Sequence, residues 1–186
     1  MATELINNPE QRLIMFHKRR GVVVTRSDNL GRRTVYDCLP SWIKAGGWIP
    51  VGRLDADTRG LLLFTTDGKL LERLTRPGMC IKTYEAWVRG RVTDDHVLQI
   101  LSGVSSKNEI LKAAHVEMKG GIGRRSRVLV QLDEGRNRHI RRLFGELRDP
   151  ERGTALKVTD LKRVRFGSLN LDVPSGHWRF AREAEV

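Results

Sequence analysis

The segment GRLDADTRGLLLFTTDG (residues 52–68) holds the most apolar run of the chain directly after a cluster of charged residues. The run Leu61–Phe64 is short and is followed by the turn signal Asp67-Gly68, which predicts a buried β-strand rather than a helix. A second strand is expected before the cluster, within WIPVGRL (48–54). These two strands would hold the charged sequence DADTR on a rigid support.

Strands and short helices alternate along the rest of the chain. The patterns predict a hairpin over 13–26, a short helix over 33–43 with Thr34 as N-cap, a helix over 69–77 stopped at Pro77, a strand over 81–92, a helix over 93–104 capped by Thr93, a strand over 126–135, a helix over 136–148 and one or two strands over 154–171. The segments KNEILKAAH (107–115) and KGGIGRR (119–125) predict a loop insertion. We therefore expect an α+β protein in two lobes, with a mixed, mostly antiparallel central sheet flanked by helices.

Charge is the most informative property of the composition. The 186 residues carry a net charge of +12, and 34 of them are Lys or Arg. Such a surplus favours a polyanionic partner, with nucleic acid ahead of an anionic membrane surface because arginine suits bidentate phosphate contacts. The alternative is a basic surface that only maintains solubility. No apolar run approaches the length of a membrane span and no signal peptide is recognised, so we expect a cytoplasmic protein without membrane association.

Cysteine and histidine offer no metal-binding pattern. Cys38 and Cys80 are far apart in the sequence, and the five histidines have no metal-ligand spacing. Free thiols in a reducing compartment are the simplest interpretation, and no structural zinc site is predicted.

The cluster DADTR (55–59) has three interpretations. A polar turn between strands explains one aspartate. A carboxylate held rigidly by a buried strand suits a nucleophile. This second interpretation accounts for the occurrence of Arg53, Asp55, Asp57 and Thr58 together. The Asp-x-Asp-x-Thr pattern also occurs in metal-dependent phosphatases of the haloacid dehalogenase type, although no βαβ series follows it here.

Two further segments carry candidate functional residues. In EGRNRHIRRLF (134–144) the apolar residues Ile140, Leu143 and Phe144, with Leu147, define the buried side of a helix. The arginines on its other side either face solvent or bind phosphate or a carboxylate, and we favour binding. In IKTYEAW (81–87), Tyr84 is by default a core or surface aromatic, but beside a nucleic-acid site it could stack on an unpaired base.

The order of these segments resembles a known family. GRLDADTRGLLLFTTDG, KTYEAWVRG (82–90) and EGRNRHIRRLF are similar to successive motifs of the ribosomal-RNA pseudouridine synthases of the small-subunit-enzyme type. FHKRRGVVVT (16–25) resembles the opening motif of that family, and KVTDLKRVRFGSLNLDVPSGHWR (157–179) resembles its closing strands. The resemblance extends from about residue 12 to residue 179.

This resemblance implies a function and a set of site residues. The chain would isomerise a specific uridine of ribosomal RNA to pseudouridine, with no cofactor and no metal. Asp55 would be the catalytic aspartate, Tyr84 would pack on the target base, and Arg141 would pair with Asp55. Whether Asp55 attacks C1′ or C6 of the uridine stays open. The implied RNA-binding residues are Lys18, Arg53, Arg136, Arg138, His139 and Arg142.

The chain is similar to compact members that act on the large subunit and lack the N-terminal S4-like RNA-binding domain. We therefore expect a tail over residues 1–11, a catalytic domain over 12–186, a monomeric protein and 23S ribosomal RNA as the partner. The chain departs from the usual pattern at His139, where the family has Gln, and at Lys18-Arg19, where it has Lys-Pro. A metal-dependent phosphatase and a non-catalytic RNA-binding module remain the alternatives.

Overall fold

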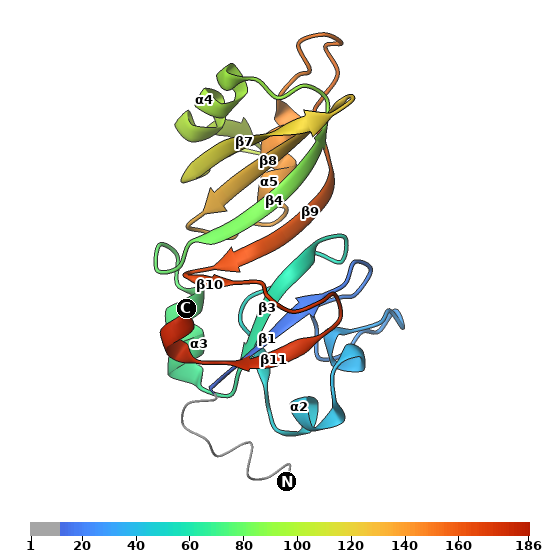
Figure 1. Cartoon of the computed structure of the whole chain (residues 1–186), viewed down its shortest axis with the longest axis vertical. Helices are drawn as coiled ribbons and strands as arrows, with labels where there is room; N and C mark the ends of the chain where they lie inside the picture. Colours follow the sequence, from blue (N-terminus) through green and yellow to red (C-terminus); the bar gives the residue numbers. More distant parts are fainter. Residues whose placement is uncertain (1–11) are drawn as a thin grey trace. The chain divides into compact units, whose positions relative to one another are not determined.

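The computed structural model describes residues 12–186, and the expected tail over 1–11 lies outside this range. The chain forms two compact units (Figure 1). Unit 1 comprises the described residues up to Cys80 together with Arg163–Val186, and unit 2 is Ile81–Lys162. The α+β class with a mostly antiparallel sheet is confirmed, because the strands that pair within each unit run antiparallel.

Unit 1 is built around strand β1 (Leu13–Lys18), which lies between β3 (Arg59–Thr65) and β11 (Trp178–Ala181). The short strand β2 (Ile49–Pro50) pairs with β3, and β10 (Leu169–Asn170) pairs with the end of β9. The predicted hairpin over 13–26 is wrong. Residues 22–26 form no strand beyond an isolated bridge of Val23 to Thr34, because both edges of β1 are already paired with distant strands.

One helix of unit 1 begins at the N-cap that the sequence predicts. The predicted helix over 33–43 is two pieces, η1 (Val35–Cys38) and α2 (Ser41–Ala45), because Pro40 separates them. Thr34 is the N-cap, and its backbone N–H donates to the Asp37 carboxylate at 2.7 Å. Asp67 caps α3 (Gly68–Thr75), and a short 3-10 helix, η2 (Glu183–Glu185), follows β11.

The core of unit 1 covers both faces of β1 and β3. One face belongs to an apolar cluster of Leu13, Met15, Val51, Leu61, Leu63, Leu70, Leu74, Phe166, Leu169 and Ala181. On the other face, Phe64 makes edge contacts with Phe16 and Tyr36, whose ring centroids lie 6.5 and 5.8 Å away. Burial on two faces explains why both strands read as nearly continuous apolar runs instead of alternating patterns.

Unit 2 contains an antiparallel sheet of β4 (Lys82–Arg89), β8 (Arg125–Leu132) and β7 (His115–Ile122), in the order β4-β8-β7. A separate hairpin is formed by β5 (Val104–Ser106) and β6 (Glu109–Leu111). The predicted loop insertion is wrong. Residues 107–115 include β6, and residues 119–125 form the end of β7 and its tight connection to β8.

Two helices accompany this sheet. Thr93 caps α4 (Asp94–Ser102) as predicted, and Ile100 of its apolar stripe is buried, whereas Leu101 is 37% exposed. Helix α5 (His139–Glu146) begins three residues later than predicted, because Arg138 has a left-handed backbone with φ of 49°. The four residues predicted to face inward on this helix, Ile140, Leu143, Phe144 and Leu147, are all buried.

Strand β9 (Lys157–Phe166) contributes residues to both units, and with β10 it confirms the strands predicted over 154–171. In unit 2, the Thr159 hydroxyl donates to the carbonyl of Trp87 in β4 at 3.1 Å. In unit 1, Arg163 Nε donates to the carbonyl of Leu61 in β3 at 2.7 Å.

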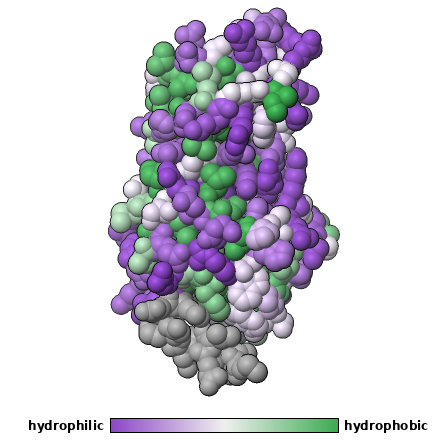
Figure 2. Space-filling model, viewed as in Figure 1, coloured by the Kyte–Doolittle hydropathy of each residue, from purple (hydrophilic) through white to green (hydrophobic). Residues whose placement is uncertain are grey.

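The surface agrees with the basic composition. On the face drawn in Figure 2, hydrophilic residues cover most of the area and hydrophobic residues form scattered patches. Within residues 12–186, no helix combines the length and the apolar character needed to cross a membrane.

Gly60 allows the close approach of β9 to β3. It has a φ of 114°, and a Cβ atom there would lie 2.6 Å from the backbone nitrogen of Arg163. We expect Gly60→Ala to lower the free energy of unfolding by roughly 2 to 4 kcal/mol, because it adds both backbone strain and a backbone clash. Urea denaturation measures this change. Gly68→Ala is the control, since a Cβ atom there meets nothing within 4 Å, and equal stability of the two variants would contradict the packing argument.

Candidate active site

The turn that carries Asp55 is anchored on both sides by buried residues. Leu54 is 7% exposed and Thr58 is 2% exposed, whereas Asp55 and the two residues after it are half-buried. The N–H of Thr58 donates to the carbonyl of Asp55 at 3.0 Å, which closes a tight turn directly before β3. The predicted arrangement of a carboxylate at the start of a buried strand is present in the structure.

Lys18 lies against this turn at the end of β1. Its side chain is 0% exposed, and its ammonium donates to the carbonyl of Arg19 at 3.0 Å and to that of Ala56 at 3.4 Å. The carbonyl of Ala56 also accepts from the N–H of Gly21 at 2.7 Å. The aspartate turn is thus fixed to the residues that follow β1 by two donors on one carbonyl.

Burial dominates the electrostatics of Lys18. Loss of hydration lowers the pKa of Lys18 to about 8, against the opposing attraction of Asp57 and then Asp55. The ammonium is therefore mostly protonated at neutral pH and gives the aspartate turn a positive neighbour. Sequence reasoning assigned Lys18 to RNA binding. Its side chain has no exposed area in this structure, and its role in RNA binding stays a prediction.

The structure offers no further support for a metal-binding pair at this turn. Among the described residues, no three His, Cys, Asp or Glu side chains gather in a way that could hold a metal ion. Asp55 and Asp57 both have charged or hydrogen-bonding neighbours in the structure. The buried ammonium of Lys18 attracts both carboxylates.

The other two predicted catalytic residues belong to unit 2. Tyr84 lies on β4 opposite Val130 of β8 and is 9% exposed. Arg141 lies on α5, half-buried, and its Nη1 donates to the carbonyl of Val158 in β9 at 2.9 Å. That bond fixes the guanidinium relative to β9. Asp55 belongs to unit 1, so its pairing with Arg141 stays a prediction.

Two of the predicted RNA-binding arginines are tied to the β5–β6 hairpin. Arg142 Nη2 donates to the carbonyl of Ser106 at 2.7 Å, and only 13% of its side chain is exposed. Arg136 forms ion pairs with Glu134 at 2.9 Å and with Glu109 at 3.4 Å. Donors of Arg142 are therefore used inside unit 2, and its contact with phosphate stays a prediction.

The remaining predicted RNA-binding residues divide by exposure. Arg53, beside the aspartate turn, and Arg138, at the start of α5, are exposed. His139 is 3% exposed, and its contact with RNA stays a prediction. Burial, the largest cause, lowers the pKa of His139, so this ring is neutral near pH 7.

Comparison with known proteins connects this arrangement to a family. The family described as RNA pseudouridylate synthase matches residues 12–146, which include the aspartate turn, Tyr84 and Arg141. The chain belongs to the RNA pseudouridylate synthase family. The resemblance inferred from the motifs is confirmed at this level.

Curated relatives of this synthase-family chain share one name. The chain is 42% identical over 170 residues to the ribosomal large subunit pseudouridine synthase B of Vibrio cholerae, covering 90% of this chain and 50% of that protein. It is 38% identical over 180 residues to the protein of the same name from Pseudomonas aeruginosa, covering 95% and 45% respectively. The chain therefore spans about half the length of the curated relatives it matches.

Solved structures support the fold. A crystal structure of a pseudouridylate synthase matches 94% of this chain and 71% of its own, with a TM-score of 0.75 and 27% sequence identity. The archaeal box H/ACA sRNP Nop10–Cbf5 complex includes a chain with a TM-score of 0.60 at 19% identity, which concerns the fold alone.

The buried position of Lys18 generates a pH-dependent prediction. The pKa of Lys18 is lower in the folded chain than the ordinary 10.5, so burying its charge costs stability in full below about pH 8, and this cost is relieved as pH rises towards 10.5. We expect Lys18→Met to be more stable than the unsubstituted chain at pH 7. That advantage should shrink by about 2 kcal/mol between roughly pH 7 and pH 10.

Thermal or urea unfolding at several pH values measures this difference. Lys69→Met on α3 is the matched control, because Lys69 is an exposed lysine of the same unit. A Lys18→Met difference that does not change with pH would show that the buried ammonium is not desolvated as described.

Proposed function

We propose that this chain isomerises a uridine of ribosomal RNA to pseudouridine, with Asp55 as the catalytic carboxylate. The observation that carries the proposal is the family match over residues 12–146 together with a carboxylate held at the start of a strand buried on both faces. The names of the relatives and the net charge of +12 support an RNA substrate.

The chemistry sets simple requirements. The N1–C1′ bond breaks, the base turns, C5 bonds to C1′, and the proton leaving C5 is balanced by one gained at N1. Composition and oxidation state are unchanged, so the reaction itself needs no redox partner. It needs an ionised carboxylate as nucleophile or electrostatic partner, and a base removed from its stack.

We assign three roles on this basis. Asp55 reacts with the uridine, Arg141 is its charge partner and favours its ionised form, and Tyr84 packs on the face of the base. The low exposure of Tyr84 suits a side chain held in one orientation.

The substrate is assigned more finely as large-subunit, 23S ribosomal RNA, because the relatives at 38 to 42% identity carry that subunit in their names. We further propose that residues 12–186 form a catalytic domain, which acts as a monomer in the cytoplasm. Arg53 and Arg138 contact flanking phosphates, since both are exposed.

Substitution of the two aspartates tests the assignment of the nucleophile. Asp55→Asn should lower turnover by roughly 10³-fold or more, with little change in RNA affinity, because the reacting charge is lost while shape is kept. Asp57→Asn should retain most of the activity. Release of tritium from C5 of labelled uridine measures turnover, and an equal, complete loss in both variants would indicate a functional pair of acids.

The same assay separates the alternatives. Tritium release that persists in EDTA supports the isomerase. Hydrolysis of a phosphate ester that EDTA abolishes, without tritium release, would instead support a metal-dependent phosphatase. RNA binding with neither activity would leave a binding module.

Substitutions of Arg141 and Arg138 are expected to affect different measurements, turnover for Arg141 and RNA binding for Arg138. Arg141→Ala should abolish most turnover at saturating RNA, because the half-buried carboxylate of Asp55 loses its proposed charge partner. Arg138→Ala should leave saturated turnover unchanged and reduce the salt dependence of RNA binding by about 0.7 to 0.9 for one lost phosphate contact. Unfolding curves of both variants check the fold, and normal turnover in Arg141→Ala would refute the pairing with Asp55.

A further inference from the structure

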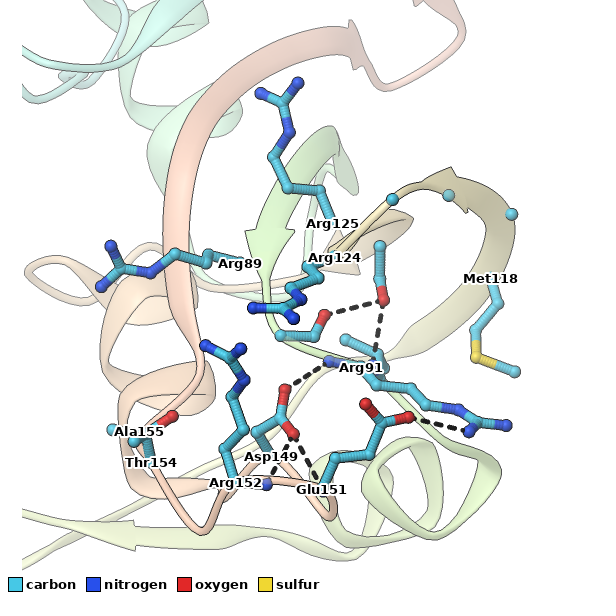
Figure 3. Close-up of a pocket in the computed structure, with 16 residues that line it drawn as sticks. Arg89, Arg91, Met118, Arg124, Arg125, Asp149, Glu151, Arg152, Thr154 and Ala155 are labelled. Carbon is cyan, nitrogen blue, oxygen red and sulfur yellow. Dashed lines mark hydrogen bonds and ion pairs between the residues drawn. The ribbon is translucent and has the colours of Figure 1, made fainter.

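Unit 2 contains a basic pocket that the proposed active-site residues do not line. Its volume is about 930 Å³, and it lies where the ends of β4 and β7, the start of β8 and the segment 149–155 meet (Figure 3). Its charged lining consists of five arginines and two acids, namely Arg89, Arg91, Arg124, Arg125, Arg152, Asp149 and Glu151. The formal excess is three positive charges.

Both acids of the pocket are occupied by structural contacts. Asp149 is 6% exposed, and its carboxylate accepts from the backbone N–H of Arg91 at 2.9 Å and from those of Glu151 and Arg152 at 2.9 and 3.2 Å. Glu151 forms an ion pair with Arg91 at 3.2 Å. Asp149 therefore fixes the segment 149–155 to the end of β4, and Glu151 neutralises only Arg91.

The other arginines keep their charge without an acidic partner. Within the described part of the chain, the side chains of Arg89, Arg124 and Arg152 make no ion pair, and Arg125 lies over the ring of Trp87 at 5.6 Å. Figure 3 shows Arg124 and Arg152 extending their guanidinium groups towards the same part of the pocket, while Arg91 turns to Glu151. Like charges gathered in a concave surface raise the local potential, which an anion would relieve.

Glycines keep this region open. Gly120 and Gly123, in the connection from β7 to β8, have left-handed φ values of 84° and 57°, and a Cβ atom at either would meet nothing within 4 Å. The absence of side chains there leaves the neighbouring arginines uncovered. Gly90, at the end of β4, would place a Cβ atom 2.8 Å from Asp149 Oδ2, so it is needed for the carboxylate to reach its backbone donors.

We propose that this pocket is a second RNA-contact site, which binds backbone phosphates of ribosomal RNA away from the target nucleotide. The forked guanidinium group of arginine can donate two hydrogen bonds to phosphate oxygens. The cavity volume is in the range that holds whole small-molecule ligands, so it exceeds the volume of one phosphate ion. The inference rests on the proposed function for its choice of RNA. Arg89 follows Tyr84 by five residues on β4, about 16 Å along the strand, so the pocket lies away from the residue proposed to pack on the base.

The test combines charge removal with salt dependence. The double variant Arg124→Gln/Arg152→Gln is compared with the unsubstituted chain for binding to an in vitro transcript of large-subunit ribosomal RNA at several salt concentrations. We expect the slope of log affinity against log salt to fall by about 1.4 to 1.8 for two lost phosphate contacts. Turnover at saturating RNA should not change, because neither arginine contacts the reacting atoms in the proposed mechanism.

Two matched variants isolate the pocket. Lys69→Gln/Arg76→Gln removes the same charge outside the pocket, from exposed Lys69 of α3 and from Arg76, the exposed C-cap of α3 that pairs with Glu72 at 2.8 Å, and should lower the slope by less than half as much. Arg124→Lys/Arg152→Lys keeps the charge and should keep most of the slope while weakening affinity modestly, since lysine lacks the bidentate fork. An effect of the pocket variant no larger than that of the α3 variant would overturn the proposal.

A further arm distinguishes RNA from a free anion. Inorganic pyrophosphate is titrated calorimetrically against the unsubstituted chain and the pocket variant. Pyrophosphate binding that the variant loses, with RNA binding unchanged, would assign the pocket to a small anion and overturn the RNA assignment. The binding and turnover measurements also separate the two proposals. If the pocket variant lowers the salt slope but the unsubstituted chain releases no tritium, the isomerase proposal alone is rejected. If the chain releases tritium but the pocket variant leaves the salt slope unchanged, the pocket proposal alone is rejected.

Discussion

Burial of β3 on both faces is the constraint on which unit 1 depends. The strand supplies leucines to the apolar cluster on one side and Phe64 to the aromatic contacts on the other. Because β3 cannot shift without leaving voids in the packed core on one face or the other, the residues just before the strand are held in a fixed position. The turn at Asp55 gains its rigidity in this way, with Leu54 and Thr58 buried around it.

The cationic side chains of this protein fall into distinct environments. Lys18 is buried beneath the aspartate turn, where its charge acts on two carboxylates. Arg142 is held by the β5–β6 hairpin, where its donors maintain the packing of unit 2. Buried or internally bonded cations cannot release counterions from a polyanion, so the net charge overstates the surface available for binding one.

Local signals predicted the elements well and their partners poorly. Proline, the Thr34 and Thr93 caps and the apolar run of β3 each act within a few residues, so they could be read directly. The strands that pair with β1 lie at 59–65 and 178–181, and no local sequence pattern predicts pairing over such a distance. The motif order identified Asp55, Tyr84 and Arg141, but the burial of Lys18 and His139 depends on tertiary packing that residue type does not reveal.

The pairing of β1 with β11 also bears on the order in which the chain folds. Unit 2 is one continuous stretch, Ile81–Lys162, whereas unit 1 needs residues from both sides of it. During synthesis, unit 2 can fold while one edge of β1 still lacks its partner strand, because β11 is translated later. An apolar strand with an unpaired edge can pair with another chain, so this edge of β1 is open to aggregation until β11 has been synthesised.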